Sequence, residues 1–343
     1  MKTITLTCGA RSDGWRSSDL YLARLSQALR EIDDPRLRIE EWRGSDSGPE
    51  WIRRRVIFPM EMSRACRGPI HLLDQSYGDA LLNFPGPAVA TVADIAFWKA
   101  RGRNPLRAHF RARIGKGLAR ARMLIAISQA TARELENEIG IPAGKIRVIP
   151  FGVDPIFFQA SAEVPDEIRP KVGNAPFLIH VGTLEERKGF LRFARAYALD
   201  RSLPKLVQVG GSPSPALMRQ LSMLGLRERI VFLGPQPLAV LHSLYQRTEA
   251  LVFPSEYEGY GVPPVEARVS GARIITTAMP SVVEALGVSP KLAKEGDSRE
   301  WLAAVRASLN EDHPGAIDKN TAEQLSWRRA AKQTIEVYES SFF

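Results

Sequence analysis

The sequence lacks the features of a disulfide-stabilised or membrane-spanning protein. Only two of its 343 residues are cysteines, Cys8 and Cys66. Two thiols are too few for a disulfide framework, so we expect a reducing compartment. No apolar run approaches the roughly 20 residues of a membrane span. Residues 1–8 faintly imitate a secretory leader, but their apolar part is short and Arg11 and Asp13 follow at once, which favours a first strand.

Acidic residues are missing from one long segment. The net charge is +9, and no Asp or Glu occurs between Asp94 and Glu134. The cations of this segment account for the whole excess of positive charge: Lys99, Arg101, Arg103, Arg107, Arg111, Arg113, Lys116, Arg120, Arg122 and Arg133. Such a distribution suits an anionic partner, namely nucleic acid, an anionic membrane or an acidic substrate.

Apolar residues recur at every fourth position within this basic segment, at Leu106, Phe110, Ile114 and Leu118. The spacing predicts a basic amphipathic helix, which Gly115 and Gly117 should weaken. Two interpretations stay open: a surface helix whose apolar stripe packs on a sheet, or a helix that docks on an anionic membrane through Arg101–Arg122. Nucleic acid is not an expected partner, because neither a recognised module nor interleaved aromatic residues accompany the charge.

Short apolar runs alternate with helical patterns along the chain, which predicts parallel sheets covered by helices. The expected strands are 3–7, 36–40, 70–74, 88–93 and 123–127, followed by 177–181, 205–209, 230–233, 250–253 and 273–277. Helices are expected to begin at Ser17 or Ser18, to run from Ser128 to Gly140, and to cover 322–340. The proline-rich stretch 150–176 lies between the two sets of strands and is interpreted as a linker.

A chain of 343 residues exceeds what one compact core usually accommodates. We therefore predict an α/β fold of two doubly wound, Rossmann-like parallel sheets that face a cleft. The expected domains are 1–155 and 156–320, and residues 321–343 are expected to form a C-terminal helix that packs back on the first domain. Ligands of such sheets bind at the carboxyl ends of the strands.

The segment from Pro254 to Glu266 combines a glycine turn with two carboxylates and follows an apolar strand pattern. We expect a helix to begin at Pro263, so that the turn offers backbone N–H groups to phosphate oxygens. Glu258 and Glu266 would repel phosphate and are expected to accept hydrogen bonds from paired sugar hydroxyls. The alternative is a purely structural helix with a glycine-rich entry. The expected backbone donors are Gly259, Tyr260, Gly261 and Val262.

This segment, which reads Glu-Gly-Tyr-Gly-Val-Pro-Pro-Val-Glu-Ala from Glu258 onward, resembles the signature of glycosyltransferase family 4, whose two-domain fold is called GT-B. Other stretches support the resemblance. His180–Gly189 resembles the first strand and loop of the family's donor domain, Ile149–Asp154 its interdomain turn, and Gly271–Ile275 with Glu284 the strand and helix after the signature. The resemblance covers the second half of the chain well and the first half weakly.

The resemblance implies that domain 156–320 binds a nucleotide-sugar donor and that domain 1–155 faces the acceptor. Lys188 and Arg187 would hold the donor diphosphate, where a fixed cation lowers the barrier to its departure. Glu266 would bind the ribose and Glu258 the transferred sugar. Family members retain the anomeric configuration and need no metal or cofactor, and no Asp-x-Asp motif occurs in this chain. The five histidines show no spacing typical of a metal site.

Two positions depart from the family pattern. Thr183, after Gly182, stands where many members have an arginine, and we expect Arg187 to compensate. Residues 91–94 resemble a Thr-x-His-Asp segment in which Ala93 replaces the histidine, so Asp94 becomes the candidate catalytic contact in the first domain. Weaker acceptor-side candidates, for which a capped strand end or an ordinary loop is the alternative, are Asp74, Ser76, Tyr77 and Gly14.

Together these features predict a retaining, metal-independent hexosyltransferase of the mannosyltransferase or polysaccharide type. It would move a hexose from a GDP- or UDP-sugar to a glycan or lipid-linked acceptor in the synthesis of a surface polysaccharide, lipopolysaccharide or glycolipid. We expect it in the cytoplasm, peripheral on the inner face of the cytoplasmic membrane. Two alternatives remain: a non-catalytic nucleotide-sugar or glycan-binding module, which Thr183 and Ala93 suggest, and a sugar-nucleotide epimerase of the same fold.

Overall fold

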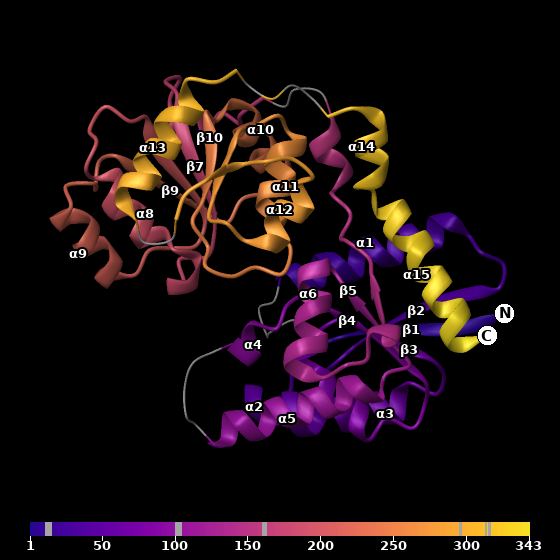
Figure 1. Ribbon diagram of the computed structural model, residues 1–343. Coiled ribbons are helices and arrows are strands. Elements are labelled where there is room, and N and C mark those ends of the chain that lie inside the picture. The colour runs from indigo at the N-terminus through magenta and orange to yellow at the C-terminus, as the bar shows by residue number, and fades with distance from the viewer. Residues whose placement is uncertain (11–15, 100–104, 160–162, 295–296, 313, 315–316) are drawn as a thin grey trace. The chain divides into compact units, whose positions relative to one another are not determined.

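The computed structural model describes residues 1–10, 16–99, 105–159, 163–294, 297–312, 314 and 317–343. They form two compact units, Met1–Gly152 with Leu325–Phe343, and Val153–Gln324 (Figure 1). Each unit is built on one six-stranded sheet in which all neighbouring strands are parallel. The predicted α/β class with two doubly wound parallel sheets is confirmed.

The sheet of the first unit has the order β2-β1-β3-β4-β5-β6. Its strands are β1 (Lys2–Cys8), β2 (Leu37–Arg43), β3 (Ile70–Leu72), β4 (Ala88–Val92), β5 (Met123–Ala126) and β6 (Ile146–Val148). Its α-helices are α1 (Arg16–Ile32), α2 (Glu50–Ile52), α3 (Phe58–Ala65), α4 (Ala96–Lys99), α5 (Pro105–Arg120), α6 (Gln129–Glu134) and α15 (Trp327–Phe342). The unit also contains two π-helical segments, η2 (Arg53–Ile57) and η4 (Leu135–Ile139), and two 3-10 helices, η3 (Gln75–Leu82) and η5 (Ala143–Lys145).

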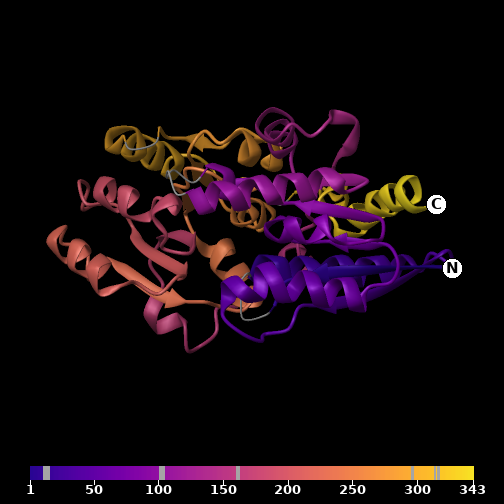
Figure 2. The same cartoon turned by 90° about the horizontal axis from the view of Figure 1, so that it is seen from below.

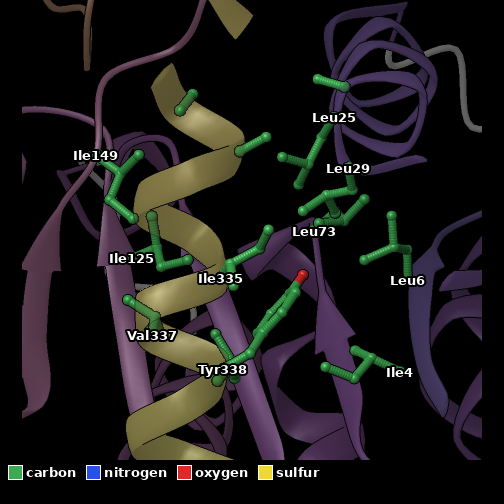
Figure 3. Packing of buried hydrophobic residues seen from close by; sticks show 14 of the residues in the cluster. Ile4, Leu6, Leu25, Leu29, Leu73, Ile125, Ile149, Ile335, Val337 and Tyr338 are labelled. Carbon is green, nitrogen blue, oxygen red and sulfur yellow. The ribbon is translucent and has the colours of Figure 1, made fainter. Parts of the chain in front are cut away.

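Helices α1 and α15 pack together on one face of this sheet, and α3, η3 and α5 lie on the other (Figures 1 and 2). The core between the sheet and α1 with α15 is shown in Figure 3, where Ile335 and Tyr338 of α15 lie opposite Leu25 and Leu29 of α1. The last helix of the chain is thus part of the first unit, because its apolar face completes the cover of that sheet.

The sheet of the second unit has the order β12-β11-β10-β7-β8-β9. Its strands are β7 (Phe177–Gly182), β8 (Lys205–Gly210), β9 (Ile230–Gly234), β10 (Ala250–Phe253), β11 (Ile274–Thr276) and β12 (Lys291–Leu292). Its α-helices are α7 (Arg169–Val172), α8 (Phe190–Tyr197), α9 (Pro215–Met223), α10 (Leu238–Arg247), α11 (Val262–Val269), α12 (Pro280–Leu286), α13 (Ser298–Leu309) and α14 (Lys319–Gln324). Two 3-10 turns are η6 (Pro155–Phe158) and η7 (Glu186–Lys188).

The strand order of each sheet reverses at one point, and this switch point is where parallel sheets bind ligands. In the first unit the reversal lies between β1 and β3, and in the second between β7 and β10. Helices α8, α9 and α13 cover one face of the second sheet and α10, α11 and α12 the other (Figure 1). Connections from the carboxyl ends of β7 and β10 therefore emerge next to each other.

Each of the ten predicted strands corresponds to an observed one within two or three residues at either end. Two short edge strands, β6 and β12, were not predicted. The predicted cap of α6 is confirmed, because the Ser128 hydroxyl accepts a hydrogen bond from the Thr131 N–H. The predicted stop at Gly140 is confirmed as well, since this glycine has a left-handed φ of 79° at the end of η4.

Two helix predictions were wrong in detail. Helix α1 already includes Ser17 and Ser18, so neither residue is its N-cap. The helix expected over 322–340 is two helices, α14 and α15, and the second is capped by the Ser326 hydroxyl, which accepts from the Arg329 N–H at 3.2 Å. Ser326 acts as the N-cap of a new helix, so the helix that was expected to be continuous is interrupted before Trp327.

The basic helix is confirmed as α5, but its apolar stripe is only partly buried. Ile114 and Leu118 are buried, whereas Leu106 is 62% exposed. Gly117 has a role that the sequence did not indicate, because a Cβ there would lie 2.0 Å from the carbonyl oxygen of Gly78 in η3. The glycine permits a close backbone approach between α5 and η3 that any side chain would block.

Candidate functional site

Two loops meet at the switch point of the second unit. One follows β7 and runs through η7, and the other follows β10 and leads into α11. The N–H of Glu256 donates to the carbonyl of Arg187 at 2.9 Å. A Cβ on Gly189, whose φ is 70°, would lie 2.0 Å from the carbonyl oxygen of Pro254. The two loops are thus fixed against each other through their backbones, which only a glycine at position 189 allows.

Lys188 and Glu258, predicted from separate motifs, form an ion pair across these loops. The Lys188 ammonium donates to Oε1 of Glu258 at 2.5 Å, and the side chains are 16% and 14% exposed. The ammonium also lies 5.9 Å from the centre of the Phe253 ring. A cation is therefore held on the carboxyl edge of the sheet, partly shielded from water, where its field on an anion is stronger than in bulk solvent.

Thr183 and Arg187 converge on a third residue of the same loop. The Thr183 hydroxyl donates to one carboxylate oxygen of Glu185 at 2.9 Å, and Nε of Arg187 donates to the other at 3.0 Å. The guanidinium that was predicted to bind phosphate is thus anchored within its own loop while remaining 36% exposed. Thr183 and Arg187 thus share Glu185 as a partner, and the compensation of the missing family arginine by Arg187 stays a prediction.

The glycine turn before α11 is held from the neighbouring strand and helix. The Ser281 hydroxyl of α12 donates to the carbonyl of Glu258, and the Thr277 hydroxyl after β11 donates to the carbonyl of Ser255, both at 2.5 Å. Gly261 has a φ of 86° and precedes the helix as its N-cap residue. This left-handed conformation favours glycine. A Cβ at this position would in addition lie 2.8 Å from a methyl carbon of Val282.

Helix α11 begins at Val262, one residue before the predicted start at Pro263. Pro263 and Pro264 then occupy its second and third positions, and proline has no N–H to offer a ligand. The helix end can therefore contribute fewer backbone donors than a helix without prolines, and the predicted donors Gly259, Tyr260, Gly261 and Val262 all precede these prolines. Gly259, Tyr260 and Gly261 are buried and Val262 is half-buried.

Glu266 lies in the second turn of α11, and it is 6% exposed. Burial raises the pKa of Glu266 to about 8, the Tyr245 hydroxyl opposes this rise, and the charge of Asp154 adds to it. The Tyr245 hydroxyl donates to Oε2 of Glu266 at 3.4 Å. Glu266 is thus a carboxyl group that is largely protonated at neutral pH until a ligand changes its surroundings.

The acceptor-side residues of the first unit lie at the carboxyl ends of β3 and β4. The Asp74 carboxylate accepts from the N–H and the hydroxyl of Ser76, at 2.9 and 2.6 Å, and so caps η3. The Gln75 side chain bridges to the next strand, accepting from the Ala93 N–H and donating to the Asp94 carbonyl. The Asp94 carboxylate accepts from the Ala96 N–H at 2.8 Å. Both aspartates thus have local structural roles, and their predicted contact with an acceptor stays a prediction.

Tyr77 is buried between two other groups of this unit. The Arg54 guanidinium lies 4.8 Å from the centre of its ring and donates to the Ser76 hydroxyl. A Cβ on Gly9, at the end of β1, would lie 2.5 Å from the Tyr77 hydroxyl oxygen. Within the described residues this hydroxyl has no hydrogen-bond partner. Gly14, the remaining candidate, lies outside the described residues.

Two buried polar residues lie near the switch point of the second sheet and were not predicted to contribute to the site. His180 on β7 and Gln208 on β8 are 1% and 0% exposed. The signal was present in the sequence, because both stand two residues before a glycine at the end of an apolar strand, as His-Val-Gly and Gln-Val-Gly. Tyr245, the partner of Glu266, was also missed, since its position in α10 gives no sequence signal.

Over the described residues, no group of three or more His, Cys, Asp and Glu side chains is arranged to hold a metal ion. In the same part of the chain, no helix has the length and apolarity needed to cross a membrane.

Comparison with known proteins identifies both units. Residues 175–311 match the family model "Glycosyl transferases group 1", and residues 75–157 match "Glycosyltransferase Family 4". The chain is 28% identical over 233 residues to an uncharacterized glycosyltransferase of Methanocaldococcus jannaschii. The aligned region covers 63% of this chain and 59% of that protein. It is 25% identical over 268 residues to O-antigen chain mannosyltransferase B of Escherichia coli, covering 73% and 70% of the two chains.

Among solved structures, the chain resembles HepE of Anabaena in complex with UDP and glucose. The TM-score is 0.76 at 18% identity, and the superposition covers 98% of this chain and 99% of the other. At this identity the likeness shows the fold, which is the predicted GT-B arrangement of two parallel-sheet units. The predicted fold is thereby confirmed, and both family-model matches agree with the predicted family.

Proposed function

We propose that this chain, which belongs to the glycosyltransferases that join a family 4 domain to a group 1 domain, transfers a hexose from a nucleotide-sugar donor to a glycan or lipid-linked acceptor. One observation carries the proposal. Lys188 and Glu258 meet at 2.5 Å on the carboxyl edge of β7 and β10, where parallel sheets of this type bind their ligands.

On donor binding, the Lys188 ammonium would leave its ion pair with Glu258 and bind the donor diphosphate instead. Cleavage of the bond between sugar and diphosphate leaves negative charge on the phosphate oxygens, and a cation already fixed nearby stabilises that charge without reorganising. The Glu258 carboxylate, released from the ammonium, would then accept hydrogen bonds from the hydroxyls of the transferred sugar. The ion pair is thus a resting arrangement that positions two side chains for different parts of one ligand.

Glu266 would bind the ribose. A protonated carboxyl can donate one hydrogen bond and accept another, and the ionised form can accept from two hydroxyls. Glu266 is buried in α11 beside Tyr245. Such a buried carboxyl group suits contact with a neutral diol, whereas a phosphate placed beside it would be energetically costly. Gly261 and Gly189 keep the backbone of both loops close to the ligand.

We propose further that the reaction retains the anomeric configuration, that the donor is a GDP- or UDP-sugar, and that no metal takes part. The family resemblance supports retention. The name of the Escherichia coli relative, an O-antigen mannosyltransferase, and the UDP and glucose in the Anabaena structure support a hexose donor and a surface-polysaccharide product. The departing phosphate would take the proton of the acceptor hydroxyl.

An anionic membrane is the proposed meeting place with a lipid-linked acceptor. The exposed first half of α5 carries Arg107 and the 62% exposed Leu106, and α5 contacts η2 through Arg55, whose guanidinium lies 5.1 Å from the centre of the Phe110 ring. The adjoining segment 50–65 exposes Trp51 and Met60. Cations beside exposed apolar side chains suit the interface of an anionic bilayer. Co-sedimentation that is equal with neutral and anionic vesicles would contradict this.

Donor turnover tests the proposed function. UDP-, GDP- and ADP-sugars are first screened by thermal shift, and release of the nucleoside diphosphate is then followed for the wild type and two variants. Lys188→Ala should lose about 100-fold or more in turnover, because one stabilising donor contributes that much. Lys205→Ala, which removes an exposed lysine at the amino end of β8, should keep wild-type turnover.

The rival functions give different outcomes in the same assay. A non-catalytic module would bind a nucleotide sugar and release no diphosphate with any acceptor. An epimerase would convert the donor without an acceptor, and the sugar configuration would change. Full turnover by Lys188→Ala would show that the site is wrongly assigned even if the chain is a transferase.

A further inference from the structure

Two buried polar side chains lie directly beneath the loop that carries Lys188. His180 and Gln208 are opposite each other in the parallel register of β7 and β8. They are 1% and 0% exposed, and the other buried residues of these two strands are apolar. Polar groups at such positions are costly unless the structure uses them.

Gln208 fixes the first residue of the loop. Its Nε2 donates to the carbonyl of Gly182 at 2.9 Å, and the N–H of Gly211 donates to the same oxygen at 3.0 Å. The Gly182 carbonyl is thereby turned toward β8. Its partial negative charge is kept away from an anion bound in front of the loop, while Gly182 adopts a φ of 150° that a residue with a side chain would resist.

His180 supports the other end of the loop. Its ring contacts Phe190 edge-on at 5.0 Å, and its Cε1 lies 3.9 Å from the place that a Cβ of Gly182 would occupy. The ring also interacts with the backbone of Lys188. Burial, together with the smaller effect of the Lys188 charge, lowers the pKa of His180 to about 3, and the contact with the Lys188 backbone opposes this shift. The imidazole is therefore neutral and does not compete with a phosphate for the ammonium.

Both side chains keep an atom without a partner. Within the described residues, Nδ1 of His180 and Oε1 of Gln208 are buried and make no hydrogen bond. Apolar residues of the same size would stabilise these strands better than two polar groups with unsatisfied atoms. Packing alone therefore does not account for a polar pair at this position under the loop of the proposed ligand site.

We propose that His180 and Gln208 are positioning residues, which hold residues 182–188 in the shape that presents Lys188 to the donor diphosphate. The inference rests on the proposed donor site and names what aligns it. Neither side chain needs to touch the donor. Their effect reaches the reaction through Lys188, whose contact with the diphosphate strengthens as negative charge develops on the leaving group.

The test uses the whole protein with four substitutions. Gln208→Leu and His180→Phe remove the polar atoms at similar size, and His180→Gln keeps a polar side chain at this buried position. Thr248→Val is the matched control, because Thr248 is equally buried and its hydroxyl donates to the carbonyl of Phe177, at the opposite end of β7. Thermal unfolding is measured for each, so that lost stability and lost alignment are separated.

We expect Gln208→Leu and His180→Phe each to lower kcat by about tenfold or more, as misplacing a catalytic contact does. The KM for the donor should change less, since the contact is made mainly in the transition state. His180→Gln should recover most of kcat. Thr248→Val should keep kcat. The pH dependence of kcat should keep its shape in all four variants, because a neutral His180 transfers no proton.

Unchanged kcat in both Gln208→Leu and His180→Phe, with Lys188→Ala inactive, would overturn the inference and leave the proposed function intact. A disappearing limb of the pH profile in His180→Phe would overturn it too, because His180 would then act as an acid or base. If the wild type turns over no donor, calorimetry with UDP and GDP replaces kcat: weaker binding in Gln208→Leu but not in Thr248→Val supports the inference, and equal binding refutes it. Gln208→Leu alone decides if His180→Phe does not fold.

Discussion

The carboxyl edges of the two sheets carry candidate residues of opposite character. In the second unit, Lys188 and Glu258 come from loops far apart in sequence and meet at 2.5 Å. In the first unit, Asp74 binds Ser76, two residues away, and Asp94 binds Ala96 in the same manner. Long-range contacts between charged side chains hold a ligand site together, whereas short-range contacts cap the ends of turns and helices.

This difference explains why the sequence points to the proposed donor site more sharply than to the proposed acceptor site. A diphosphate needs a cation, a backbone shape and a close approach, and these demand particular residue types such as Lys188, Gly189 and Gly261. An acceptor hydroxyl needs only polar groups, which the carboxyl end of any strand supplies for its own capping. The predictions below test whether the two edges differ in this way, from the largest expected effect to the smallest.

The link between the two donor loops should be the most sensitive feature. Gly189→Ala places a Cβ 2.0 Å from the Pro254 carbonyl at a φ of 70°, so the loops must separate. We expect the free energy of unfolding to fall by about 2–4 kcal/mol, from strain and overpacking together, and donor turnover to be lost. Chemical denaturation measures the change. Gly144→Ala, where no atom lies within 4 Å of the added Cβ, should be nearly neutral, and equal effects of the two would contradict this account.

Glu258→Gln should separate sugar recognition from diphosphate binding. The neutral amide no longer holds Lys188 and cannot accept as strongly from sugar hydroxyls, so kcat should fall by about 100-fold. The affinity for UDP or GDP should stay equal or rise, because Glu258 no longer competes for the ammonium. Calorimetry with both nucleotides checks this, and a weakened nucleotide in Glu258→Gln would show that the carboxylate supports the diphosphate rather than the sugar.

Glu266 should make the stability of the protein depend on pH. Burial raises its pKa from the ordinary 4.5 to about 8, so the folded protein binds the proton more tightly than the unfolded chain. The stabilisation is complete below about pH 4.5 and is lost as the pH rises through about 8, with a slope of at most about 1.4 kcal/mol per pH unit. Thermal unfolding between pH 5 and 9 should show this fall in the wild type and a flatter curve in Glu266→Gln.

Glu228→Gln, which changes an exposed carboxylate far from α11 in sequence, is the control for that measurement and should follow the wild type. A wild-type curve that matches Glu266→Gln across the whole range would show that Glu266 is ionised in the folded protein.

Asp74→Ala should have the smallest effect. It removes a cap of η3 in which the carboxylate binds the N–H and hydroxyl of Ser76, which costs about 1 kcal/mol of stability. The affinity for UDP should not change, and the KM for an acceptor should change only if Asp74 also binds the acceptor. A loss of nucleotide affinity as large as that expected for Lys188→Ala would remove the distinction between the two edges.

The fold could be predicted from the sequence where apolar runs mark the strands, and the prediction failed at two short strands on sheet edges. Each strand of four or more residues was expected, but β6 and β12 have three and two residues at sheet edges and carry no recognisable alternation. The break between α14 and α15 was missed because the helical spacing of Trp327, Ala331, Ile335 and Tyr338, which all lie in α15, was extended backwards over Ser326, where a new helix starts. The close approach of α5 to η3 depends on Gly117, which looked like a weak point of a helix and is a contact.

For the site, residue types were predictable and their partners were not. The pairing of Lys188 with Glu258 joins two motifs that are 70 residues apart, and only the strand order brings them together. Tyr245 changes the proton affinity of Glu266 from another helix. The polar residues His180 and Gln208 gave a signal in sequence, but their register on adjacent strands became visible only in the folded sheet.

The central claim is that the donor diphosphate binds at the carboxyl edge of the second sheet. Its most direct test is the calorimetric Kd of UDP and GDP for the wild type, Lys188→Ala and Tyr77→Phe, the last of which removes a buried hydroxyl of the first unit that has no partner within the described residues. We predict that Lys188→Ala weakens the nucleotide that binds by about tenfold or more and that Tyr77→Phe leaves it unchanged. An unchanged Kd in Lys188→Ala, or a weakened one in Tyr77→Phe alone, would contradict the claim.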